Sequence, residues 1–129
     1  MAFDDMGGKI WYNGQLVDWN QPRVHILSHG LHYGSCVFEG ERAYGGKIFK
    51  HEEHIERLFF SAKELDMDIP YSQAQIEDAC YEALEAEGHQ DAYIRPVVWR
   101  GSGMMAVSAQ NSGVHCAVET WKWGAYFPR

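Results

Sequence analysis

The chain has 129 residues, which suits one domain or one part of a larger protein, and its hydrophobic content of 46% is enough for a core. Its 18 acidic side chains against 11 lysines and arginines give a net charge of −7, which argues against a nucleic-acid-binding surface. No apolar run approaches the length that spans a membrane.

The N-terminus and the cysteines indicate the cellular compartment in which the protein is expected. Residues 1–8 are acidic and lack the apolar stretch of a signal peptide. Cys36, Cys80 and Cys116 are an odd number at wide spacing, which indicates reduced thiols rather than a disulfide framework. Both observations predict a cytoplasmic protein.

Two tight turns predict antiparallel hairpins in the first part of the chain. Asn13-Gly14 lies between the short strands of "KIWYNGQLVDW", and Gly45-Gly46 lies between strands at residues 41–44 and 47–50. The apolar run "RVHIL" is a further strand candidate. Residues 9–50 are therefore predicted to form a meander of antiparallel strands.

Two helices are predicted next, at residues 51–68 and 71–88. The second begins at a capping box formed by Ser72 and Gln75 and ends at Gly88. The apolar face of the first comprises Ile55, Leu58, Phe59, Ala62 and Leu65. The apolar face of the second comprises Ile76, Ala79, Cys80, Ala83 and Leu84.

Strand patterns return at "DAYIRPVVWR" and "GVHCAVETWKWGAY", joined by a glycine- and serine-bearing segment. The order of strands, two helices and strands predicts an α+β fold in which two helices pack on an antiparallel sheet. Because Pro96 lacks an amide hydrogen, its strand is expected at an edge of the sheet or beside a distortion.

The histidines are possible metal ligands. His25, His29 and His32 have a helical spacing, and His51 and His54 form a second pair. The first group stands in a predicted strand and loop, and no zinc motif occurs in the chain. We therefore expect hydrogen-bonding structural histidines and no metal site.

Two arginines are candidates for anion binding. Arg57 lies beside the apolar stripe near the start of its helix, where a phosphate could bind; the pattern alone favours a solvated side chain paired with Glu53 or Ser61. Tyr93 and Arg95 are two residues apart, so on a strand they share one side. Arg95 on this aromatic face suits a structural ion pair or a carboxylate-binding group equally well.

Four segments together resemble a known family: "SHGLHYGSCVFEGERAY", "HEEHIERL", "AYIRPVVWRG" and "WKWGAY". Their order and spacing are similar to those of the branched-chain amino-acid aminotransferases, which are fold-type IV enzymes that use pyridoxal 5′-phosphate (PLP). The resemblance runs from about residue 10 to residue 126. It implies an N-terminal tail at 1–8, the small α/β domain at 9–124 and the start of an interdomain linker at 125–129.

The resemblance implies roles for residues in the first half of the chain. Arg57 matches the arginine that binds the cofactor phosphate, which overrides the preference from the pattern alone. Tyr33, Phe38 and Gly40 match positions that line the pocket for the substrate side chain. Tyr33 and Phe38 are five residues apart, so sharing one pocket requires a bulge or bend, expected at Gly34.

The second half of the chain supplies the rest of the implied pocket. Tyr93 and Arg95 match residues near the substrate carboxylates, and Trp123 and Tyr126 match its far wall. The loop at residues 105–107 matches one that reaches the neighbouring subunit of a homodimer. Residues 104–112 lack the proline that the family pattern places in this loop.

The catalytic lysine of the family, which forms the Schiff base, is expected downstream on a larger domain. The lysines of this chain, none of which matches it, are Lys9, Lys47, Lys50, Lys63 and Lys122. The 129-residue chain alone is thus predicted to be inactive. The full-length homodimer or higher oligomer would exchange an amino group between leucine, isoleucine or valine and 2-oxoglutarate in branched-chain amino-acid biosynthesis.

Two alternatives stand beside this reading. One is another enzyme of the same fold, such as a D-amino-acid transaminase or an aminodeoxychorismate lyase. The other is a non-catalytic, self-associating module.

Overall fold

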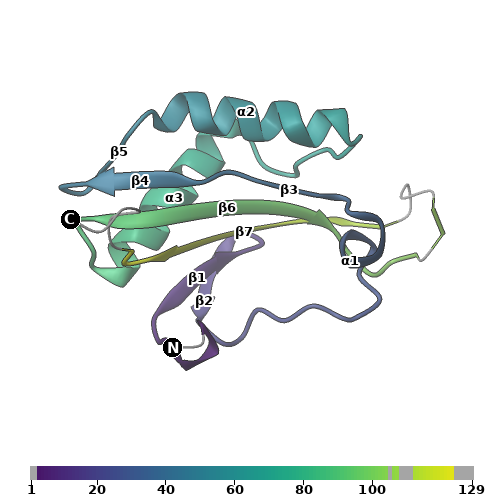
Figure 1. Ribbon diagram of the computed structural model, residues 1–129, viewed down its shortest axis with the longest axis horizontal. Helices are drawn as coiled ribbons and strands as arrows, with labels where there is room; N and C mark the ends of the chain where they lie inside the picture. The colour runs from purple at the N-terminus through teal and green to yellow at the C-terminus, as the bar shows by residue number, and fades with distance from the viewer. Residues whose placement is uncertain (1–2, 105, 108–111, 124–129) are drawn as a thin grey trace.

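The computed structural model describes residues 3–104, 106, 107 and 112–123, which form an antiparallel sheet with the two long helices on one face (Figure 1). The strands are β1 (Lys9–Tyr12), β2 (Gln15–Asp18), β3 (Cys36–Phe38), β4 (Glu41–Tyr44), β5 (Lys47–Ile48), β6 (Ala92–Arg100) and β7 (Val114–Trp121). The helices are the 3-10 turn η1 (Phe3–Asp5), α1 (His29–Tyr33), α2 (His51–Glu64) and α3 (Gln73–Glu87). The α+β prediction is confirmed.

The sheet has the strand order β2-β1-β7-β6-β4-β5, and β3 also pairs with β6. Helices α2 and α3 lie against one face, and the apolar core is enclosed between them and the strands. The other face is called the open face below; the segment that joins β2 to α1 runs along its lower side, beneath β7 in Figure 1. None of the described helices combines the length and hydropathy needed to cross a bilayer.

Both predicted hairpins are present. Asn13 and Gly14 adopt positive φ of 46° and 103°, and Gly45 and Gly46 adopt 59° and 80°, the backbone that a two-residue hairpin turn demands. The second hairpin is shorter than predicted, because β5 ends at Ile48 and the chain then turns into α2.

Helix α2 buries most of its predicted face. Ile55, Leu58 and Ala62 are buried, and Phe59 packs against the core. Leu65 was predicted on this face but is exposed, because it is the C-cap residue and lies past the last helical turn.

Helix α3 follows the sequence signals at both ends. The Ser72 hydroxyl accepts from the Gln75 amide at 3.1 Å, while the Gln75 side chain accepts from the Ser72 amide at 2.8 Å. Gly88 closes the helix in the left-handed conformation with φ of 72°. All five apolar residues predicted to face the core are buried.

The strand predicted at residues 23–27 is absent. The segment forms a turn instead: the Ser28 amide donates to the His25 carbonyl, and the Leu27 amide donates to the His25 ring. β-branched residues favoured a strand, but none of the described strands pairs with this segment, so local hydrogen bonds decide its structure.

The bulge expected at Gly34 is also not present. Residues 29–33 form the short helix α1, and Gly34 ends it with a left-handed φ of 72°; the Gly34 amide donates a hydrogen bond to the Gly30 carbonyl. The chain does bend at Gly34, but as a helix C-cap, and β3 begins only at Cys36. Residues 9–50 are therefore not a continuous meander.

Pro96 lies in the centre of the sheet and not at its edge. It pairs with Val118 of β7, and on its other side β3 and β4 leave a break at Glu39 and Gly40. The Pro96 carbonyl still accepts from the Glu39 amide at 3.0 Å. The missing proline donor is tolerated because the neighbouring ladder is interrupted, which is the distortion that the sequence allowed.

Candidate functional site

A tyrosine and an arginine on the open face form the centre of the site. Tyr93 and Arg95 point from β6 to the same side, as their spacing predicts, and two guanidinium nitrogens of Arg95 donate to the Tyr93 hydroxyl, Nη2 at 2.7 Å and Nε at 3.1 Å. The Arg95 guanidinium carbon lies 4.2 Å from the centre of the Phe38 ring. Arg95 is thus held by aromatic side chains through a hydrogen bond and a cation–π contact.

Gly40 makes room for Tyr93. A Cβ atom at residue 40 would lie 2.6 Å from the Tyr93 hydroxyl and 3.2 Å from two of its ring carbons. A side chain at this position would displace the tyrosine that holds Arg95. The glycine therefore serves the close approach expected from its place in the sequence.

The end of the described chain adds two tryptophans to this group. The Tyr93 ring lies 4.9 Å from the Trp121 ring and 4.8 Å from the Trp123 ring, between centroids. Arg42 holds the backbone at Trp123 through a 3.0 Å hydrogen bond to its carbonyl. The structure therefore brings together five of the predicted pocket residues: Phe38, Gly40, Tyr93, Arg95 and Trp123.

The other predicted pocket residues lie elsewhere or outside the described chain. Tyr33 ends α1 with its ring 4.5 Å from that of His29, and the His29 amide bonds to the Gly101 carbonyl beyond the C-terminal end of β6. Tyr126 lies outside the described residues, as does Met105 of the predicted inter-subunit loop.

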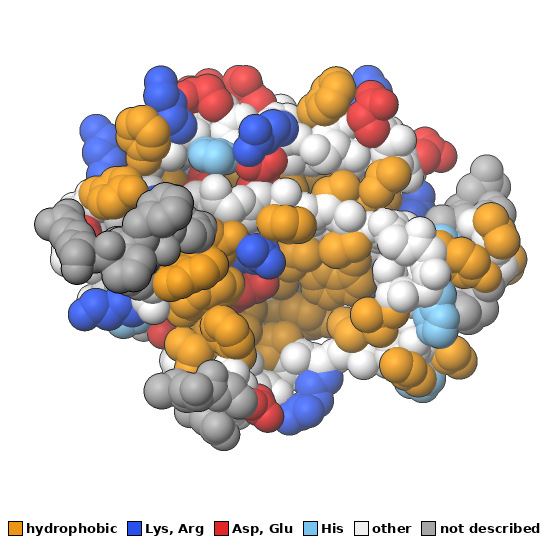
Figure 2. All heavy atoms as spheres, viewed as in Figure 1, with side chains coloured by type: hydrophobic (Ala, Val, Ile, Leu, Met, Phe, Trp, Pro, Cys, Tyr) orange, Lys and Arg blue, Asp and Glu red, His pale blue; other side chains and the backbone are white. Residues whose placement is uncertain are grey.

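The open face contains a cavity of about 560 Å³ that the sequence patterns did not predict. Figure 2 shows this hollow with hydrophobic side chains along its walls. Its larger lining residues include Tyr12, Trp19, Val97, Trp99 and Trp121. Three of these follow the two-residue alternation of β6 and β7, but Trp19 belongs to a segment whose path the sequence did not reveal.

Glu119 is the acidic residue that the cavity lining shares with the Arg95 region. It is half-buried on β7, directly opposite Arg95 in the β6–β7 register. Burial raises the pKa of the Glu119 carboxyl to about 7, and the nearby charge of Arg95 opposes this rise. The signal that could have found it was an acidic residue within the apolar strand "HCAVETW".

Arg57 is paired, but its partner is not the one that the helical spacing suggested. Its Nε and Nη2 each donate to a different oxygen of Glu39 at 2.8 Å, and His54 shares that carboxylate at 2.8 Å. The pairing with Glu53 or Ser61 that the pattern favoured is thus replaced by a fork to Glu39 from the β3–β4 break.

Glu39 connects Arg57 to the aromatic group. Glu39 is buried, and its chain neighbours are Phe38 and Gly40. Burial alone would raise the pKa of the Glu39 carboxyl, but the hydrogen bonds from Arg57 and His54 outweigh burial and lower it. Glu39 therefore remains a carboxylate that fixes the direction of the guanidinium.

The arrangement at Arg57 fits a phosphate group. Its side chain is 66% exposed although two of its nitrogens are held by Glu39. Within the described chain no hydrogen bond engages the third nitrogen, Nη1. An oriented, solvent-accessible guanidinium with a free donor is suited to bind a phosphate oxygen.

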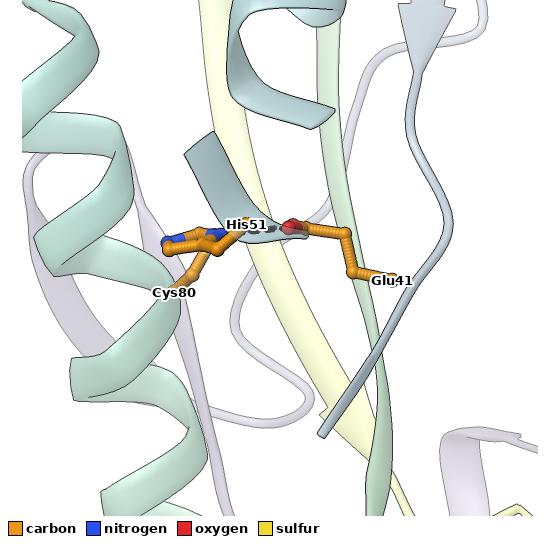
Figure 3. A group of neighbouring side chains, drawn as sticks. All are labelled: Glu41, His51 and Cys80. Carbon is orange, nitrogen blue, oxygen red and sulfur yellow. Dashed lines mark hydrogen bonds and ion pairs between the residues drawn. The ribbon is translucent and has the colours of Figure 1, made fainter. Parts of the chain in front are cut away.

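A third group of polar side chains lies in the core between β4, α2 and α3 (Figure 3). The His51 Nδ1 lies 2.6 Å from Glu41, its Nε2 lies 3.1 Å from the Glu77 carbonyl, and the Cys80 thiol donates to Glu41 at 3.8 Å. Burial disfavours a charged His51, but the bond to Glu41 outweighs it and raises the pKa of His51.

These side chains satisfy one another. A structural zinc site uses four ligands, and among the described residues only Glu41, His51 and Cys80 come together. The ring nitrogens of His29 similarly contact the Ser35 hydroxyl at 2.6 Å and the Ala106 carbonyl at 3.0 Å. Both ring nitrogens of His29 and of His51 thus have hydrogen-bonding neighbours, and the expectation that the chain binds no metal stays a prediction.

The fold and site define a class: a small α+β domain that presents an anchored arginine on an aromatic face and a second arginine suited to a phosphate. The family model for class IV amino-transferases matches residues 36–129. The chain therefore belongs to the class IV aminotransferase family.

Within this family, the chain is similar to branched-chain aminotransferases. The chain is 45% identical over 130 residues to the branched-chain-amino-acid aminotransferase of Pseudomonas aeruginosa, covering 98% of this chain and 42% of the relative. It is 53% identical over 93 residues to a probable branched-chain-amino-acid aminotransferase of Rickettsia bellii, covering 72% of this chain and 32% of that protein.

Solved structures agree with these relatives. The Escherichia coli branched-chain amino acid aminotransferase superposes with a TM-score of 0.88 at 35% identity, covering 94% of this chain and 41% of that one. The Thermoproteus uzoniensis branched-chain aminotransferase with norvaline gives a TM-score of 0.87 at 34% identity, covering 94% and 42%. The chain thus spans between 32% and 42% of the length of these relatives.

Proposed function

We propose that this chain is the substrate-binding and phosphate-binding part of a PLP-dependent branched-chain aminotransferase. The full-length protein would exchange an amino group between leucine, isoleucine or valine and 2-oxoglutarate. The observation that carries the proposal is Arg95, which is held by Tyr93 and Phe38 on an otherwise aromatic and apolar face. The similarity to branched-chain aminotransferases supports the same choice of substrates.

Two kinds of substrate side chain must fit one pocket. An aliphatic side chain is favoured by the rings of Phe38, Tyr93 and Trp123, which offer apolar surface. Glutamate and 2-oxoglutarate bring a second carboxylate, for which the Arg95 guanidinium is the charge partner. Because Arg95 is stabilised by the tyrosine hydroxyl and the phenyl ring, its orientation does not depend on an ion pair with an acidic side chain.

Arg57 is assigned to the cofactor phosphate. Glu39 holds two guanidinium nitrogens and leaves Arg57 accessible, so the binding geometry is set before the phosphate arrives. PLP, when bound, would supply the electron sink that amino-group transfer requires. The catalytic lysine is assigned to the part of the protein that the relatives have beyond the length spanned here.

The chain is also proposed to form a cytoplasmic homodimer or higher oligomer. Apolar side chains on and near α1 are exposed, including Ile26 at 71%, Leu31 at 61% and Val107 at 78%. Exposed apolar residues of this kind favour association with another subunit or domain. Light scattering of the full-length protein tests this directly, and a monomer would contradict it.

The activity is tested on the full-length protein with PLP. Leucine and 2-oxoglutarate should yield glutamate. Arg95→Leu should raise the KM for 2-oxoglutarate more than tenfold, which is on the order of the loss of one hydrogen bond to a charged group. The KM for 4-methyl-2-oxopentanoate should stay unchanged. Failure to transfer the amino group of leucine with cofactor bound would reject the proposal. Transfer from D-alanine instead would support a D-amino-acid transaminase.

A further inference from the structure

Glu119 is an acidic group in the site that the proposed function leaves without a role. It faces the cavity from β7 and lies directly across from Arg95 on β6. In an antiparallel pair, residues directly opposite each other have side chains on the same face, a few ångströms apart. Glu119 therefore lies beside the guanidinium that is proposed to receive a substrate carboxylate.

The two side chains are neighbours but not partners. Over the described part of the chain, no side-chain hydrogen bond and no ion pair within 4.0 Å joins the Glu119 carboxyl to Arg95 or to another residue, although the two backbones are paired in the β6–β7 ladder. Arg95 instead leans toward β3 and its own strand, onto Phe38 and the Tyr93 hydroxyl. A carboxyl in an apolar cavity without a hydrogen-bonding partner is costly in its ionised form.

Among the described groups around Glu119, Arg95 is the neighbour that carries a positive charge. Cys36 on β3 is uncharged, because burial and the charge of Glu119 both raise the pKa of its thiol. Tyr12 on β1 and Asp4 on η1 also line the cavity, and neither carries positive charge. The cavity lining, as far as the chain is described, contains no lysine or arginine.

We propose that Glu119 is a positioning residue that controls how readily Arg95 accepts the second carboxylate of a dicarboxylic substrate. An ionised Glu119 competes with that carboxylate for Arg95 and repels it, whereas a protonated Glu119 leaves the guanidinium to the substrate. This inference rests on the proposed function of Arg95 and extends it to a specificity-determining residue on a different strand.

Proton linkage follows from the competition. The carboxyl of Glu119 has a pKa of about 7, so near neutral pH it exists in both forms. A bound dicarboxylate adds a second negative charge and favours the protonated form, so binding takes up a proton. An aliphatic substrate brings no second negative charge to Arg95, so its binding should take up no proton.

The pH dependence of substrate choice tests this in the full-length enzyme. The measured quantity is kcat/KM for 2-oxoglutarate divided by kcat/KM for 4-methyl-2-oxopentanoate, from about pH 6 to about pH 9, a range that spans the ordinary and raised values of a carboxyl pKa. We expect this ratio to fall about threefold or more above pH 7, with a limit of about tenfold per pH unit if binding strictly requires the proton. In Glu119→Gln, which cannot ionise, the ratio should be flat and, at the alkaline end of the range, higher than in the wild type.

A second measurement does not depend on turnover. Calorimetric titration with glutarate in two buffers of different ionisation enthalpy gives the number of protons taken up per glutarate bound. Slightly above neutral pH, this number should be a substantial fraction of one proton for the wild type. It should be near zero for Glu119→Gln and for Glu119→Ala. Glu85→Gln, at an exposed position on α3, is the matched control and should behave as the wild type.

The outcomes separate this inference from the function on which it rests. Equal pH profiles and equal proton uptake for the wild type and both Glu119 variants would overturn it, as would failure of glutarate to bind. Proton-linked glutarate binding that depends on Glu119, in a protein that does not transfer amino groups, would contradict the proposed activity alone.

Discussion

At the scale of single residues, the site depends on one residue that is small enough to admit its neighbour and on one that carries a charge to bind its neighbour. Gly40 leaves the space that the Tyr93 ring occupies, and Glu39 holds the guanidinium of Arg57. These two residues are adjacent, and the break between β3 and β4 lets them serve opposite sides of the chain. Changes at this break should therefore affect both arginines by different routes.

Gly40→Ala is expected to destabilise the protein and to weaken dicarboxylate binding. The added Cβ would lie 2.6 Å from the Tyr93 hydroxyl, and neighbouring tryptophan rings restrict the movement of Tyr93. Overpacking of this kind costs about 1–3 kcal/mol in unfolding free energy, measurable by urea denaturation. Gly7→Ala is the control, because a Cβ there meets no atom within 4 Å; equal losses for both variants would contradict the explanation.

Glu39→Gln should change the acid stability of the protein. The folded pKa of Glu39 is lowered, so its ion pairs add stability above the ordinary pKa of about 4.3, and this stability is lost as pH falls through the folded value. Near neutral pH we expect a loss of roughly 1 kcal/mol or more in the variant, shrinking at acid pH. Urea denaturation from about pH 3 to about pH 7 measures it, with the exposed Glu56→Gln as control. A difference independent of pH would refute this role.

Residue spacing alone predicted part of the site. The period of two placed Tyr93 and Arg95 on one side, and the structure confirms it. Glu39 was missed because its partner Arg57 is 18 residues away on another element, a distance that no local pattern spans. The phosphate role of Arg57 came from family resemblance and stays a prediction.

At the scale of elements, turns and helix caps were predicted correctly from the sequence, whereas strands that depend on a pairing partner were not. Two hairpin turns and the caps of α3 were predicted correctly because each depends on a few adjacent residues. Residues 23–27 were predicted as a strand but form a turn, and α1 interrupts the predicted meander at residues 29–33, because a strand requires a partner that the sequence does not specify. For Pro96 the sequence predicted either an edge strand or a nearby distortion, and the structure shows the distortion, at the break between β3 and β4.

The pair of Glu41 and His51 joins β4 to α2 and should make stability depend on pH. The folded pKa of His51 is raised, so its contribution is complete below the ordinary pKa of about 6.5 and is lost as pH rises through the folded value. Glu41→Gln breaks this buried pair and should cost about 3 kcal/mol at mildly acidic pH.

The measurement is urea denaturation of wild type and variant from about pH 6 to about pH 9, which brackets the titration of His51. The stability difference should shrink as pH rises, because His51 then loses the charge that Glu41 stabilises. Glu82→Gln, exposed on the outer side of α3, should show no such trend. A constant difference across this range would show that the pair contributes through packing and not through charge.

At the scale of the whole molecule, the two faces of the sheet are covered by different means. Helices α2 and α3 enclose a continuous core on one side. On the other side the segment after β2 lines one wall of an open cavity of about 560 Å³, and its residues Val24, Ile26 and Leu27 are exposed. Figure 2 shows the cavity as a hollow with hydrophobic side chains along its walls. The face that carries Arg95 is thus the less completely packed one, which suits a site that must admit substrates of two shapes.

Trp19 anchors this covering segment, so its removal should loosen the open face while leaving the helical face intact. Trp19 is 8% exposed, its indole nitrogen donates to the Phe3 carbonyl at 2.6 Å, and its amide donates to the Gly8 carbonyl. Trp19→Ala removes a large buried side chain and should cost about 3–5 kcal/mol, whereas Trp19→Phe keeps most of the apolar contact and should cost about 1 kcal/mol. Hydrogen exchange should then show lost protection in β1 and β2 and unchanged protection in α3. Equal exchange in the two variants would mean that the indole ring does not hold the segment, and that the face is closed by other contacts.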